Sequence, residues 1–95
     1  MLQNSKLKER SFLVYGLGLS GLSVIRFFKK KKFKNFKIWD DKQTNLFKSH
    51  RTRNLDLSLN QVDYIVLSPG ISTFTNKKLR KYKKKIITDI DLFFL

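Results

Sequence analysis

All four glycines and the only proline of this 95-residue chain fall in two short segments, 16–21 and 69–70. The first segment, Gly-Leu-Gly-Leu-Ser-Gly, follows the apolar run Phe12–Tyr15 and precedes a helix-like run from Leu22 to Phe28. A Gly-x-Gly-x-x-Gly pattern between a strand and a helix is typical of a loop that binds a diphosphate. Because glycine has no Cβ, the ligand can approach the backbone, and free N–H groups at the helix start favour an anion. The sequence therefore predicts a phosphate-binding turn, and the alternative is a tight strand-to-helix turn with close packing and no ligand.

Short apolar runs alternate along the chain with segments that favour helix. The predicted strands are Phe12–Tyr15, Phe36–Trp39, Val62–Leu67 and Ile86–Thr88, and the predicted helices begin at Leu19 or Ser20, cover Asn76–Lys85 and begin again at Asp89. Strands that alternate with helices predict an α/β fold, here a Rossmann-like parallel sheet of four to five strands with flanking helices. The length suits one such domain, residues 1–95.

The region between Lys42 and Gln61 has the weakest pattern. Residues 45–49 are compatible with one helical turn, and Leu55, Leu57 and Leu59 alternate as they would in a short strand.

Composition excludes several classes of protein. The chain has no Cys, which rules out disulfides and thiolate metal sites, and its single His50 cannot build a histidine metal site. We therefore predict neither a metal site nor a catalytic residue in this chain. No apolar run approaches the roughly 18 residues of a membrane span, and the polar N-terminus lacks the apolar core of a signal peptide. We expect a cytoplasmic protein without membrane contact.

The formal net charge of +14 makes a nucleic-acid-binding module one interpretation. The lysines, however, are concentrated in residues 29–32 and 77–85, where a helix would end or face solvent. The aromatic residues are mostly Phe in apolar runs, not stacking residues placed between arginines. A solvated basic surface is the favoured interpretation, and such a surface attracts anionic ligands such as a nucleotide diphosphate.

Two further motifs follow predicted strands. Asp40 comes about 20 residues after the glycines, where an acidic side chain contacts a ribose in dinucleotide-binding folds. Its alternative role is that of a turn or cap residue. Lys42 can reach the face of a base or form an ion pair with Asp41. Ser68-Pro69-Gly70-Ile71 ends the third predicted strand, so all three turns follow carboxyl ends of strands, where parallel sheets bind ligands.

Four segments together resemble the N-terminal domain of the Mur ligase family, and within it the ligases that add D-glutamate to a peptidoglycan precursor. They are residues 16–23, 38–41, 63–71 and 86–93, in that order and approximate spacing. The resemblance covers nearly the whole chain. The Ser-Pro-Gly-Ile turn and the acidic helix start near the C-terminus distinguish it from generic Rossmann domains.

The resemblance implies that this domain binds UDP-N-acetylmuramoyl-L-alanine. The diphosphate would contact Gly16, Gly18, Leu19, Ser20 and Gly21, and the uracil and ribose would contact Asp40, Asp41, Lys42, Ser68 and Gly70. Such ligases form an amide bond through an acyl phosphate, and they bind ATP with Mg²⁺ in a central domain and D-glutamate largely in a C-terminal domain. We therefore expect the N-terminal fragment of a longer multidomain ligase, with no cofactor of its own and inactive alone.

Two alternatives stay open. The glycine loop and Asp40 fit an NAD(P)-binding Rossmann domain of a dehydrogenase or regulatory protein equally well, although such a domain does not predict the Ser-Pro-Gly-Ile turn. The second alternative is the basic nucleic-acid-binding module. The chain also departs from the family in three respects. Lys42 stands where Arg is common, and Thr88 where Gly is usual. Lys stacks on a base less well than Arg. The connection from Lys42 to Gln61 is short by comparison, so we expect a third strand to be reduced or absent.

Overall fold

A computed structural model describes residues 7–42, 47–68 and 76–93. In chain order the elements are β1 (Phe12–Tyr15), α2 (Leu19–Lys30), β2 (Phe36–Trp39), a 3-10 turn (Lys48–His50), α3 (Leu55–Gln61), β3 (Tyr64–Leu67), α4 (Lys77–Lys81), a 3-10 turn (Lys83–Lys85), β4 (Ile86–Ile87) and α5 (Asp89–Phe93). Strands and helices alternate, as predicted.

The four strands of the described residues form one parallel sheet in the order β2-β1-β3-β4. Val14 of β1 lies opposite Ile38 of β2 and Val66 of β3. The predicted α/β fold with a parallel sheet of four to five strands is confirmed. Between β2 and β3 the described residues add only a single parallel bridge, from Ile38 to Arg51.

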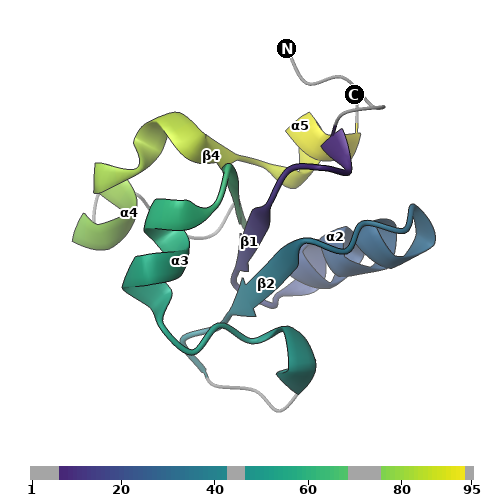
Figure 1. The fold of residues 1–95 in the computed structure, drawn as a ribbon, viewed down its shortest axis with the longest axis horizontal. Helices are drawn as coiled ribbons and strands as arrows, with labels where there is room; N and C mark the ends of the chain where they lie inside the picture. Colours follow the sequence, from purple (N-terminus) through teal and green to yellow (C-terminus); the bar gives the residue numbers. More distant parts are fainter. Residues whose placement is uncertain (1–6, 43–46, 69–75, 94–95) are drawn as a thin grey trace.

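Helices cover both faces of the sheet, as Figure 1 shows with α2 on one side and α3 and α4 on the other. Successive residues of β1 point to opposite faces. Phe12 and Val14 belong to a core that includes Ile25 and Phe28 of α2. Leu13 and Tyr15 belong to a second core that includes Leu59 of α3 and Leu79 of α4. Because both faces of the sheet are covered, the two central strands β1 and β3 are continuous apolar runs, whereas the edge strand β2 contains the exposed Lys37.

Helix α2 starts at the glycine segment and ends in a Schellman motif. Lys32 adopts a left-handed φ of 63°, and its N–H donates to Lys29 O over 3.2 Å. The N–H of Phe33 donates to Phe28 O over 2.8 Å, and the two rings stack with centroids 5.1 Å apart. The chain therefore leaves α2 sharply and returns to the sheet as β2.

The predicted strand through Leu55, Leu57 and Leu59 is wrong, because these residues belong to α3. The Asn54 side chain caps this helix by accepting the N–H of Leu57 over 3.1 Å. In a helix Leu55 and Leu59 lie one turn apart on the packed face, whereas Leu57 turns to solvent and is 49% exposed.

Other boundaries shift by a few residues. β3 begins at Tyr64 and not at Val62, because the N–H of Val62 closes α3 by donating to Ser58 O. The predicted helix 76–85 is divided: Asn76 caps α4, which ends at Lys81, and a 3-10 turn follows. β4 ends at Ile87, because Thr88 and Asp91 form a reciprocal capping box at the start of α5.

No helix within the three described ranges is long and apolar enough to cross a membrane.

Candidate functional site: the edge cleft

A cleft of about 330 Å³ lies at the carboxyl ends of β1, β2 and β3. We call it the edge cleft, and its lining residues are Tyr15, Gly16, Leu17, Gly18, Asp40, Asp41, Lys42 and Ser68. The strand order reverses between β1 and β3, so this cleft lies at the topological switch point, where open α/β sheets bind ligands.

The cleft brings together six of the predicted site residues: Gly16, Gly18, Asp40, Asp41, Lys42 and Ser68. Leu19 lies at the start of α2 with its side chain 88% exposed. Ser20 and Gly21 line a narrow gap beside the cleft, which Ser68 also borders. Gly70 falls in residues 69–75, outside the described part of the chain.

The three glycines of the loop differ in what they do for the fold. Gly16 has a φ of 96°, a conformation that side chains rarely adopt. A Cβ on Gly21 would lie 2.1 Å from Gly16 O, so this glycine allows the helix to pack on the turn. Gly18 has an ordinary φ of −72°, and a Cβ there would meet nothing within 4 Å. Neither backbone conformation nor packing therefore requires glycine at position 18.

Gly18 is also the N-cap of the twelve-residue helix α2. No side chain caps this end of the helix, and the first turn holds no acidic residue. The first N–H groups of a helix have no partner within it, and the helix dipole places partial positive charge there. This end of the cleft can therefore bind an anion.

Asp40 ties the second loop of the cleft to the first. Its Oδ2 accepts the N–H of Leu17 over 2.7 Å, and its Oδ1 accepts the N–H of Lys42 over 2.8 Å. Both carboxylate oxygens thus hold backbone groups of the loops. This contact corresponds to the turn role that the sequence left open for Asp40.

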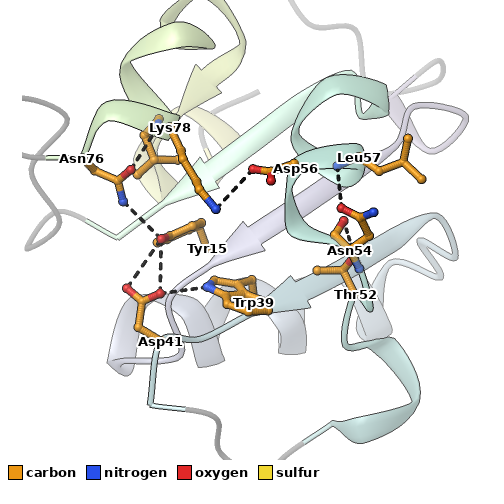
Figure 2. Close-up of polar contacts among 10 residues, drawn as sticks. Tyr15, Trp39, Asp41, Thr52, Asn54, Asp56, Leu57, Asn76 and Lys78 are labelled. Atoms are coloured by element: carbon orange, nitrogen blue, oxygen red, sulfur yellow. Dashed lines mark hydrogen bonds and ion pairs between the residues drawn. The ribbon is translucent and has the colours of Figure 1, made fainter.

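Asp41 accepts hydrogen bonds from two aromatic side chains, as Figure 2 shows. Trp39 Nε1 donates to its Oδ1 over 2.8 Å, and the Tyr15 hydroxyl donates to the same oxygen over 3.3 Å. Burial raises the pKa of the Tyr15 phenol above its ordinary value of 10.0, against the smaller opposing effect of a hydrogen bond from Asn76. The negative charge of Asp41 also raises this pKa, so the phenol keeps its proton at neutral pH.

Ser68 places a polar atom at the cleft without a partner. Its Oγ is buried and has no hydrogen bond within the described residues, and the same holds for Asp89 Oδ1. Both residues border the narrow gap beside Gly21. An unpaired buried polar atom costs about 1–3 kcal/mol, so Ser68 is a candidate ligand contact at this end of β3.

Comparison with known proteins agrees with this geometry. Residues 10–90 match the family described as Mur ligase MurD-like, N-terminal domain. The chain belongs to this family. It is 34% identical over 94 residues to the UDP-N-acetylmuramoylalanine–D-glutamate ligase of Buchnera aphidicola subsp. Schizaphis graminum. The aligned region covers 88% of this chain and 21% of the relative. It is 35% identical over 97 residues to the ligase of the same name from Rickettsia prowazekii, covering 92% of this chain and 21% of the relative. The chain thus spans about a fifth of the length of these relatives.

In this Mur ligase domain, sequence reasoning missed Tyr15, Leu17, Trp39 and Asn76 as parts of the cleft and its supports. Tyr15 and Trp39 read as the last apolar residues of their strands. The one signal that could have identified them is that both carry a polar group at the carboxyl end of a strand. Within the described ranges, no group of three or more His, Cys, Asp or Glu could hold a metal ion.

A second and larger cleft, of about 430 Å³, lies on the far side of β2. We call it the outer cleft, and the cationic side chains and the histidine that line it are Lys34, Lys37, His50, Arg51 and Arg53. No acidic residue is among its lining residues. It holds none of the residues predicted from the glycine loop, and it lies away from the switch point of the sheet. The larger of these two clefts therefore contains none of the predicted site residues.

Proposed function

We propose that this chain binds UDP-N-acetylmuramoyl-L-alanine as the N-terminal domain of the ATP-dependent ligase that adds D-glutamate in cytoplasmic peptidoglycan precursor synthesis. The names of its relatives support this substrate. So does the edge cleft, which combines a glycine turn, an uncapped helix end, the segment Asp40–Lys42 and Ser68 at the end of β3.

The observation that carries the proposal is the glycine at position 18. Gly16 and Gly21 are needed for the turn itself, so a protein without any ligand would also keep them. At Gly18 the fold accepts a side chain, because φ is −72° and the space around a Cβ is open. A diphosphate that approaches the backbone supplies the missing reason for glycine.

The substrate then extends along the cleft in a fixed order. Its diphosphate lies on the glycine turn and the start of α2, with contacts to Gly16, Gly18, Leu19, Ser20 and Gly21. Its uracil and ribose lie in the second loop and at the end of β3, with contacts to Asp40, Asp41, Lys42, Ser68 and Gly70. Asp40 contributes mainly by holding this loop, because both of its oxygens accept backbone N–H groups.

Ligase activity requires more than this chain. Each of its four glycines is followed by Leu or Ile, so the sequence contains no Gly-Lys-Ser/Thr phosphate loop for ATP. ATP, Mg²⁺ and D-glutamate would bind in the further domains of a full-length enzyme. The 95-residue chain alone binds its substrate without turning it over.

Calorimetric titration of the purified chain with UDP-N-acetylmuramoyl-L-alanine and, separately, with NAD tests the proposal. We expect saturable one-to-one binding of the UDP substrate and weaker binding of NAD. Tighter binding of NAD would contradict the proposal and favour the dehydrogenase interpretation. Binding of neither ligand by the folded chain would also contradict it.

A further inference from the structure

A chain of hydrogen bonds joins Asn76 to Tyr15 and Asp41, two residues that line the edge cleft (Figure 2). Asn76 Nδ2 donates to the Tyr15 hydroxyl over 3.1 Å, and this hydroxyl donates to Asp41 Oδ1 over 3.3 Å. The direction is fixed, because an amide nitrogen only donates and a carboxylate only accepts. Trp39 Nε1 donates to the same Asp41 oxygen over 2.8 Å.

Each end of this chain of bonds is held by secondary structure. Asn76 Oδ1 accepts the N–H of Leu79 over 3.2 Å, so its amide caps α4 while its nitrogen reaches Tyr15. The Tyr15 side chain is only 3% exposed and belongs to the core with Leu13 and Leu67. Its ring cannot move without disturbing that core, so the hydroxyl is a fixed point at the end of β1.

We propose that Tyr15 is a positioning residue of the edge cleft, a role that rests on the proposed function. Its hydroxyl holds Asp41 against Asn76 and so fixes the segment Asp40–Lys42, which would carry the uracil. The bond from Asp40 to Leu17 holds the same segment to the glycine turn. Tyr15 supplies a second hydrogen bond to this segment and connects it to Asn76 at the start of α4.

The bond from the Tyr15 hydroxyl acts on Asp41, in the loop that would hold the uracil, and not on the glycine turn that would hold the diphosphate. Without the Tyr15 hydroxyl, Asp41 retains Trp39 as its side-chain donor among the described residues. We therefore expect loss of the hydroxyl to weaken binding of the whole UDP substrate more than binding of pyrophosphate alone, whose contacts lie on the glycine turn.

Tyr15→Phe removes the hydroxyl and keeps the ring, and Trp39 provides a direct probe because it is the only tryptophan in the chain. In the free protein, the indole N–H resonance of Trp39 should shift in Tyr15→Phe. It should not shift in the control Tyr64→Phe, because Tyr64 lies at the amino end of β3 and its ring stacks on Phe12 with centroids 5.6 Å apart. Affinity for UDP-N-acetylmuramoyl-L-alanine should fall about three- to tenfold in Tyr15→Phe only.

Asn76→Ser provides a second variant, because serine keeps an oxygen that caps α4 and removes the amide donor. Asn76→Ser should also lower the affinity for the UDP substrate. The double variant with Tyr15→Phe should bind the substrate no more weakly than Tyr15→Phe alone. An unmoved indole resonance, an unchanged affinity, or equal losses for the UDP substrate and pyrophosphate would overturn the role of Tyr15. Absence of binding by the unsubstituted chain would overturn the proposed function and this role with it.

Discussion

At the scale of single residues, two glycines of the motif are required by the fold, and we propose that the third is required by the ligand. Gly16 is needed for its φ of 96°, and Gly21 for the 2.1 Å approach of its Cβ position to Gly16 O. Only Gly18 is unexplained by the chain itself. A match to Gly-x-Gly-x-x-Gly therefore indicates a tight turn first. It indicates a ligand only where neither the backbone conformation nor the packing requires one of the glycines.

Two substitutions separate the effect of a glycine on fold stability from its effect on ligand affinity. Gly18→Ser should leave the free energy of unfolding unchanged or raise it by about a few tenths of a kcal/mol, because serine is a good N-cap and its Cβ has room. It should nevertheless reduce affinity for the UDP substrate at least about tenfold, because the side chain occupies the diphosphate position. Gly21→Ala, its matched counterpart, should destabilise the fold by about 2 kcal/mol or more through the clash with Gly16 O.

Urea unfolding and calorimetric titration of both variants measure the two effects. Unimpaired binding by Gly18→Ser would show that the diphosphate does not approach this residue. A stable Gly21→Ala variant would show that the helix can shift away from the turn.

Sequence reasoning found the loops of the cleft but not the contacts between them. The glycine segment and Asp40 were identified because their spacing follows a known local pattern. The bond from Asn76 to Tyr15 joins positions 61 residues apart, and no local pattern encodes it. Tyr15 also fits its strand as an apolar residue, so its hydroxyl gave no separate signal.

At the scale of elements, predictions succeeded where two signals agreed. β1, β2 and the start of α2 were predicted correctly because an apolar period and a turn signal coincide there. For Leu55–Leu59, alternation alone favoured a strand, and the capping Asn54 was the neglected signal for α3. Alternation over five residues also occurs when a short helix exposes its middle position, as Leu57 does.

In the lysine-rich segment 77–85, the ammonium group of Lys85 binds the end of a helix and does not simply face solvent. Lys85 Nζ donates to the carbonyl oxygens of Leu59, Asn60 and Val62 over 2.8, 2.6 and 2.9 Å, at the C-terminal end of α3. Lys85→Met should therefore lower the free energy of unfolding by about 1–2 kcal/mol. Lys84→Met, at an exposed neighbouring position, should change it little. Equal urea midpoints for the two variants would contradict this role of Lys85.

At the scale of the whole molecule, the net charge of +14 attracts anions to the entire surface and does not select one site. The outer cleft, lined by Lys34, Lys37, Arg51 and Arg53, is larger than the edge cleft and richer in cations. We nevertheless propose that the UDP substrate binds in the edge cleft, where the glycine turn, the start of α2, the segment Asp40–Lys42 and Ser68 meet.

Whether the substrate occupies the edge cleft is measured most directly by amide NMR of the 95-residue chain during titration with UDP-N-acetylmuramoyl-L-alanine. The largest shifts should occur at residues of the edge cleft, namely Gly16, Leu17, Gly18, Asp41 and Ser68, and at the indole N–H of Trp39. The outer-cleft residues Lys34, His50 and Arg53 should shift little. Largest shifts at the outer cleft, or saturation without shifts in the glycine turn, would contradict the account.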